Sequence, residues 1–78
     1  MKPHLFTLIQ LSGRFAHPAP VVGDSLADLM DSIDFRTFDH FHQSAFIVDN
    51  TNGSVERTLS IDECEGLLWF DADGDAVE

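Results

Sequence analysis

The residues best suited to chemistry lie in the segment "DFRTFDHFHQ" (residues 34–43), where His40 and His42 flank a phenylalanine and follow Asp39. If this segment is extended, alternate side chains point to the same side, and the two imidazoles lie next to each other. They could then bind zinc, with Asp39 or a distant acid as a further ligand. Zinc requires three or four ligands, however, and no other histidine or cysteine stands at a recognisable spacing from this pair.

A helical conformation of the same segment is the alternative. Phe35, Phe38 and Phe41 would then share one face and form part of the core, whereas His40 and His42 would diverge by about 200°. The histidines would lie at or near the surface. Because the ligand count decides against zinc, we favour a structural role for the segment and expect neither a metal nor a cofactor.

A second candidate is the segment "DADGD" (residues 71–75), which resembles the start of a calcium-binding loop with oxygen ligands at alternate positions. The EF-hand pattern requires glycine at its sixth position, where this chain has Ala76. We therefore predict a solvated acidic tail over residues 71–78. Nucleophile-elbow, zincin and phosphate-loop motifs do not occur in the sequence, so we predict that the protein is not an enzyme and has no catalytic residues.

Regularly spaced acids form the third candidate, because Asp24, Asp28, Asp31 and Asp34 are four, three and three positions apart. On a helix they would form one stripe, with successive carboxylates about 4.5–6 Å apart along the axis. Like charges at this spacing destabilise a helix by about 0.2–0.5 kcal/mol per pair, and no lysine lies between them. We interpret the stripe as a surface for a basic partner; the alternatives are an ordinary solvated face and adaptation to high salt.

Local patterns predict the elements that must position these residues. Residues 4–12 ("HLFTLIQLS") mix β-branched, aromatic and polar residues and predict a strand. Residues 24–33 ("DSLADLMDSI") place apolar residues at helical spacing behind Asp24, a good N-cap. Residues 44–50 and 54–61 flank the turn "TNG" and predict a β-hairpin.

The last element is predicted over residues 60–70 ("SIDECEGLLWF"). Ser60 and Glu63 fit a capping box and favour a helix, although Gly66 leaves a short buried strand over "GLLWF" as the alternative. The resulting order, β-α-β-β-α, predicts an α+β fold with a small antiparallel sheet and helices on one face. Seventy-eight residues predict a single domain over residues 1–78.

Charge is the most unusual property of the chain, because 14 acidic residues face four basic ones and the net charge is −10. The last 21 residues contain seven acids and no base. Such a protein is repelled by nucleic acid and by anionic membranes, and is attracted to proteins that bind them. One cysteine, Cys64, permits no intrachain disulfide, and no apolar run approaches the ~20 residues of a membrane span. We expect a soluble, cytoplasmic protein.

We therefore predict a non-enzymatic inhibitor that binds the basic surface of a nucleic-acid-binding protein by mimicking phosphates. In size and charge the chain is similar to small acidic proteins of phages and mobile elements, which include DNA-mimic and anti-CRISPR inhibitors. That resemblance implies a host defence complex or nuclease as the target. The alternative is a self-association module, a homodimer that uses exposed phenylalanines and Trp69, with acids serving only solubility. The acidic residues that we predict to bind the partner are Asp24, Asp28, Asp31, Asp34, Asp62, Glu63, Glu65, Asp71, Asp73 and Asp75.

Overall fold

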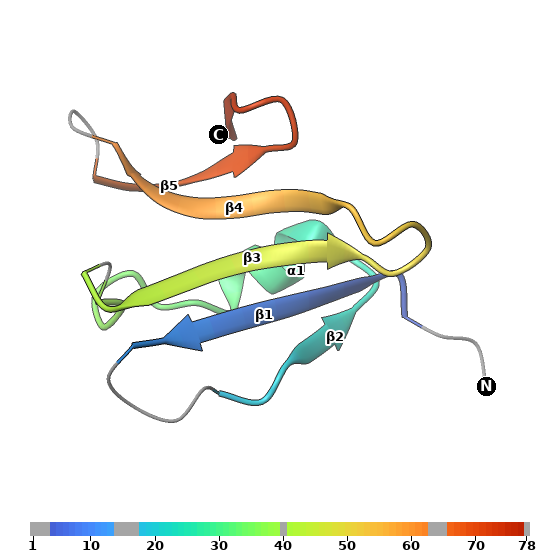
Figure 1. Cartoon of the computed structure of the whole chain (residues 1–78), viewed down its shortest axis with the longest axis horizontal. Coiled ribbons are helices and arrows are strands. Elements are labelled where there is room, and N and C mark those ends of the chain that lie inside the picture. Colours follow the sequence, from blue (N-terminus) through green and yellow to red (C-terminus); the bar gives the residue numbers. More distant parts are fainter. Residues whose placement is uncertain (1–3, 14–17, 40, 63–65, 78) are drawn as a thin grey trace.

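A computed structural model describes residues 4–13, 18–39, 41–62 and 66–77. In this part of the chain, six strands form one antiparallel sheet in the order β2-β1-β3-β4-β5-β6, and a short helix packs on one of its faces (Figure 1). No helix among the described residues is long and apolar enough to span a membrane. The elements are β1 (Phe6–Ser12), β2 (Val21–Gly23), α1 (Leu26–Asp31), β3 (Gln43–Asp49), β4 (Val55–Asp62), β5 (Gly66–Asp71) and β6 (Ala76–Val77).

The predicted first strand and the predicted hairpin are confirmed as β1 and as β3–β4. Strand β1 pairs with β3 over its whole length, from Phe6 opposite Asp49 to Ser12 opposite Gln43. The hairpin turn contains Gly53 at φ +75°, a conformation that glycine adopts without steric cost. Its N–H donates to the Asp49 carbonyl oxygen (2.8 Å), which closes the turn.

The core lies between the sheet and α1. Because side chains alternate along a strand, every second residue of each central strand faces the helix. Met30, Ile33, Phe38 and other half-buried apolar residues pack around this core. Figure 1 shows α1 behind β3 and β4 and no labelled element in front of them, so the described elements cover only one face of the sheet. The buried core residues are Leu8, Leu29, Ala45, Ile47, Leu59 and Trp69.

The predicted α+β fold with helices on one face is wrong, because the described residues of the segment predicted as a C-terminal helix, 60–62 and 66–70, are strand. Its first residues end β4, and "GLLWF" belongs to β5, which pairs with β4 from Asp62 opposite Gly66 to Arg57 opposite Asp71. Leu67 and Trp69 face the core, so the apolar run has a period of two within the sheet. Strand β5 also pairs with β6, and pairing on both sides outweighs the local helical pattern. The strand alternative for residues 66–70 is therefore confirmed.

The predicted first helix exists but is shorter than expected, and Asp24 does not cap it. Ser25 is the N-cap, and its Oγ accepts a hydrogen bond from the Asp28 N–H (3.3 Å). The helix ends at Asp31, where the Ser32 hydroxyl donates to the Leu29 carbonyl oxygen (2.6 Å). The four-residue stripe predicted on one helix is therefore wrong in geometry, because only its two central members are helical.

The segment "DFRTFDHFHQ" is neither a strand nor a continuous helix over its described residues. The Phe38 N–H donates to the Asp34 carbonyl oxygen, and the Gln43 N–H donates to the Asp39 carbonyl oxygen, so that two turns follow one another. The three phenylalanines therefore do not share a face. Phe38 packs against the core, whereas Phe35 is 41% exposed and Phe41 is 81% exposed, which corrects the predicted aromatic core trio.

Candidate functional site

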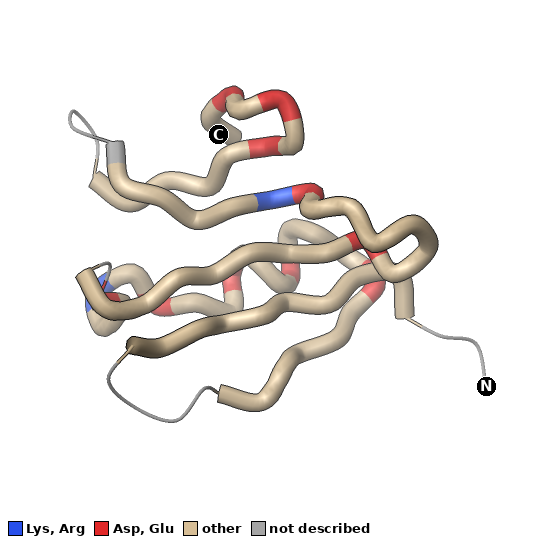
Figure 2. The backbone as a smooth tube through the Cα atoms, viewed as in Figure 1, with Lys and Arg blue, Asp and Glu red and all other residues tan. Residues whose placement is uncertain are grey.

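Apart from Asp62, Glu63 and Glu65, the predicted acidic residues fall into two groups along the chain, one around α1 and one that begins at the end of β5 (Figure 2). Asp28 and Asp31 lie on α1, with Asp24 before it and Asp34 after it. Asp62 is the last residue of β4, and Glu63 and Glu65 lie outside the described residues. The second group contains Asp71, at the end of β5, with Asp73 and Asp75 in the turn before β6.

Two of the predicted residues have structural partners. The Asp24 carboxylate accepts a hydrogen bond from the Leu5 N–H (3.0 Å) and lies 3.4 Å from His4 Nδ1, so it holds the chain entering β1. The Asp34 carboxylate is 3.2 Å from Arg36 Nε and also accepts the Arg36 N–H (2.9 Å). The hydrogen bond from the Arg36 side chain, followed by that from its backbone, lowers the pKa of Asp34.

Asp71 also has a structural role, because its carboxylate organises the turn between β5 and β6. Its Oδ1 accepts the N–H of Asp73 (2.9 Å) and the N–H of Asp75 (3.0 Å). The Asp71 N–H in turn donates to the Asp75 carbonyl oxygen (2.9 Å). The carboxylates of Asp73 and Asp75 themselves remain at the exposed surface of this turn.

Four of the predicted carboxylates have no cationic neighbour in the described part of the chain. No basic side chain of that part lies within 4.0 Å of Asp28, Asp31, Asp73 or Asp75, and all four residues are exposed. Asp28 lies in the first turn of α1, where a negative charge is favourable. Asp31 lies at the opposite end, where the helix carbonyl groups disfavour a carboxylate and no basic residue offsets it.

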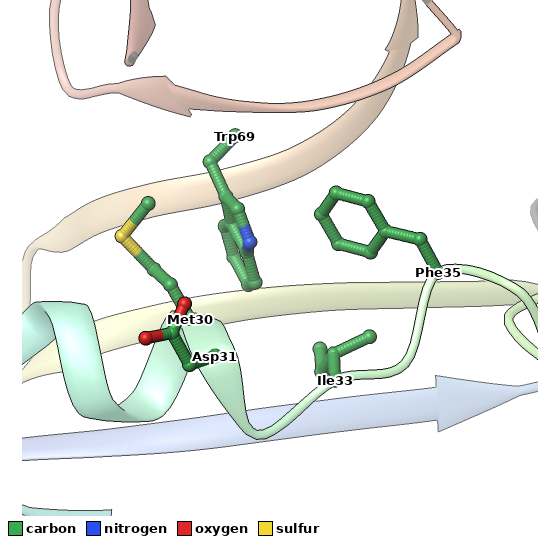
Figure 3. A pocket seen from close by; sticks show the side chains of 5 residues that line it. All are labelled: Met30, Asp31, Ile33, Phe35 and Trp69. Carbon is green, nitrogen blue, oxygen red and sulfur yellow. The ribbon is translucent and has the colours of Figure 1, made fainter.

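The Asp31 side chain lines a pocket of about 340 Å³ (Figure 3). The end of α1, the loop that follows it and strand β5 build this pocket together. Its walls are mainly apolar, with an indole, a phenyl ring and a thioether around a single carboxylate. The complete lining is Met30, Asp31, Ile33, Phe35 and Trp69, and we call it the aromatic pocket.

Trp69 is both a core residue and a wall of the aromatic pocket. Its side chain is only 5% exposed, whereas the self-association alternative assumed an exposed indole, and this assumption is wrong. Its buried Nε1 has no hydrogen-bond acceptor among the described residues. Figure 3 shows the indole edge that carries Nε1 turned toward the side where Phe35 lies. A buried N–H without a partner lowers the stability of the folded state by about 1–3 kcal/mol. Trp69 Nε1 is therefore an unusual group in this core.

His42, the described member of the histidine pair, does not belong to a metal-binding cluster of described residues. His42 Nδ1 lies 2.7 Å from Asp39 Oδ2, and the Asp39 Oδ1 accepts the Phe41 N–H (3.1 Å), so Asp39 stabilises the turn before β3. His40 lies outside the described residues. In the part of the chain that the structure describes, no group of three or more potential metal ligands occurs.

The face of the sheet opposite α1 is a second surface with a distinct character. A row of residues, Ile9, Phe46, Thr58 and Phe70, is in register across four strands. The phenylalanines and Ile9 are only half-buried and do not belong to the core. We call this surface the open sheet face; its apolar residues are Ile9, Leu11, Phe46, Val48, Leu68 and Phe70.

Comparison of the chain with protein-family models, with curated proteins and with solved structures gave no match. Sequence reasoning selected Asp31 from its spacing but missed the other walls of the aromatic pocket. No pattern in the sequence relates residues 30–35 to residue 69, because the sheet brings them together.

Proposed function

We propose that the protein is a small, non-enzymatic inhibitor that binds the basic surface of a nucleic-acid-binding protein, with its carboxylates taking the place of phosphates. The observation that carries this proposal is the surplus of unneutralised carboxylates at Asp28, Asp31, Asp73 and Asp75. The described residues contain three ion pairs, and two of them depend on a histidine. Among the described residues, these pairs leave the carboxylates of Asp28, Asp31, Asp73 and Asp75 available to a partner.

The position of Asp28 and Asp31 supports phosphate mimicry. They are three residues apart on α1, which corresponds to a rise of about 4.5 Å along the helix axis. Successive phosphates of one DNA strand are about 3.4 Å apart along the duplex axis, a distance of the same order. Arginine and lysine side chains arranged for phosphates can therefore reach both carboxylates. Long-range attraction would also speed the encounter and would weaken as salt screens the charges.

Binding to captured nucleic-acid-binding proteins tests this proposal. Proteins retained from the lysate of the source cells would be eluted with a salt gradient and identified by mass spectrometry. Each captured nucleic-acid-binding protein would then be assayed for displacement of a DNA duplex by the purified chain. We expect displacement by the native chain and its loss in the double variant Asp28→Lys, Asp31→Lys.

Ala27→Gln is the matched control, since it alters an exposed, uncharged position on the same helix. Circular dichroism and the fluorescence of Trp69 establish that both variants are folded. Equal displacement by the native chain and by the charge-reversed variant would contradict phosphate mimicry. Retention that does not weaken with salt would contradict it as well.

Self-association through the open sheet face is the second candidate function. It is favoured by the half-buried apolar residues on the side of the sheet that α1 does not cover. A second copy is a suitable occupant, because it offers an equally apolar face of the same shape. The aromatic pocket and α1 lie on one side of the sheet, and this interface lies on the other. A dimer could therefore still bind a partner.

A further inference from the structure

We propose that the aromatic pocket receives the side chain of an arginine that belongs to the basic partner. This inference rests on the proposed function and gives it a specific contact. The pocket combines three features that suit an arginine in a peptide: aromatic side chains, a carboxylate and, buried in its wall, an N–H donor without an acceptor. Its volume of about 340 Å³ lies within the range of about 300–1,000 Å³ for small-ligand sites.

The aromatic walls are the first feature. Trp69 and Phe35 approach the pocket from β5 and from the loop after α1, respectively (Figure 3). A cation over an aromatic face is attracted by the negative charge of the ring face, and tryptophan binds it most strongly. Met30 and Ile33 add apolar surface for the three methylene groups of an arginine side chain.

The Asp31 carboxylate is the second feature. It is exposed, it has no cationic neighbour among the described residues, and it occupies the negative end of α1. A guanidinium in the pocket would neutralise it and would also face the terminal carbonyl groups of the helix. Arginine fits better than lysine, because its planar group is weakly hydrated, stacks on rings and bonds a carboxylate with two N–H groups.

The buried indole N–H is the third feature, and it argues for a peptide rather than a free cation. Trp69 Nε1 needs an acceptor, which a guanidinium does not have. A main-chain carbonyl oxygen next to the arginine would supply one. Because Nε1 is buried, this hydrogen bond requires a side chain in the pocket wall to move.

A titration of the ¹⁵N-labelled protein tests the inference. The chain contains one tryptophan, so a single indole N–H resonance reports on the pocket. The probe is N-acetylarginine N-methylamide, compared with the citrulline analogue, which has nearly the same shape and no charge. We expect a saturable shift of the indole resonance with the arginine probe, a binding constant at least tenfold weaker for citrulline, and a weaker one for the lysine analogue.

Two matched variants separate the pocket from general electrostatics. Asp31→Asn removes the carboxylate of the pocket, whereas Asp28→Asn removes the same charge from the same helix outside it. We expect Asp31→Asn to weaken binding of the arginine probe at least tenfold and Asp28→Asn to change it less than twofold. Equal effects of both variants, or equal shifts with arginine and citrulline, would overturn the inference.

The two proposals can fail separately. If the chain displaces DNA from its partner but does not bind the arginine probe, the pocket assignment is wrong and phosphate mimicry stands. If the probe binds at Asp31 but the charge-reversed variant still displaces DNA, the pocket assignment stands and phosphate mimicry is wrong.

Discussion

Several aspartates of this chain are explained by turns rather than by a partner. Asp34, Asp49 and Asp71 each accept, through the carboxylate, the N–H of the residue two positions later, at 2.8–2.9 Å. Asn52 does the same with Ser54 (2.9 Å), which shows that the charge is not required. Such Asx turns make aspartate and asparagine frequent where chains reverse. Part of the acidity therefore belongs to the fold, and the carboxylates that form no such turn are the better candidates for binding.

At the residue scale, we expect Thr51→Val to raise the pKa of Asp49 toward its ordinary value of 3.8. The Thr51 hydroxyl donates to Asp49 Oδ1 (2.6 Å), and this side-chain bond is the largest cause that lowers the pKa of Asp49; the Thr51 N–H contributes next. The pKa of Asp49 is measured from its carboxyl ¹³C chemical shift as a function of pH. The pKa of Asp34 is the internal control and should not change, and an unaltered pKa of Asp49 would contradict the assignment.

The lowered pKa values also set the pH dependence of the free energy of unfolding. Carboxylates whose pKa is lower in the folded state stabilise it above the unfolded value, near 3.8, and this contribution is lost as pH falls through the folded pKa. Acid should therefore weaken the turns at residues 34–36 and 49–51. The free energy of unfolding that acid removes should be smaller in Thr51→Val, because ionised Asp49 stabilises this variant less at neutral pH.

At the element scale, the turns matter more than the helix. Helix α1 has six residues and is too short to be stable without its packing on the sheet, where Leu29 is buried. The antiparallel neighbours β3 and β4, by contrast, are joined by a turn that is stabilised by its own backbone hydrogen bonds. The hairpin is therefore the element whose local sequence contributes most to the fold.

We expect Gly53→Ala to lower the free energy of unfolding by about 1 kcal/mol, because φ is +75° there and a side chain strains that conformation. A Cβ at this position meets no atom within 4 Å, so the cost is conformational rather than steric. Urea denaturation measures it. Gly13→Ala is the control, since a Cβ there makes an ordinary 3.5 Å contact with the His42 carbonyl oxygen. A loss in Gly13→Ala as large as in Gly53→Ala would refute the role of φ.

At the scale of the whole molecule, one sheet with one small helix leaves much apolar surface outside the core. The four longer strands, about 4.8 Å apart with a rise of about 3.4 Å per residue, present a flat area of roughly 450 Å². Because side chains protrude from the sheet, its accessible surface is larger than this flat area. Stable interfaces bury about 800 Å² on each partner. The open sheet face is therefore large enough to contribute most of a dimer interface.

We expect the protein to dimerise, and we expect salt to strengthen the dimer, because two copies of charge −10 repel each other. Partner binding should instead weaken with salt. Sedimentation equilibrium at two salt concentrations measures the association. The double variant Phe46→Thr, Phe70→Thr should be monomeric, whereas Phe41→Thr, the same change at an exposed position outside the open sheet face, should still dimerise. A native chain that stays monomeric would rule out the second candidate function.

Some features were determined by the sequence alone, because they depend on residues that are close in the chain. The alternation in β1, the Asn-Gly turn between β3 and β4, and a helix starting near Ser25 follow from local geometry and hydrogen bonding. The net charge of −10 is a property of composition. Asp31 could also be selected from its spacing, although its neighbours in space could not.

Only the tertiary structure decided the remaining features, because they depend on contacts between separate elements. Pairing with β4 made a strand of residues 66–71, where the local pattern favours a helix. The end of α1 and β5 meet only through the sheet, so the aromatic pocket around Trp69 has no signature in the sequence. Likewise, the aspartates that stabilise turns can be told from those that face solvent only by the hydrogen bonds of the folded chain. The amino-acid composition does not distinguish the two kinds.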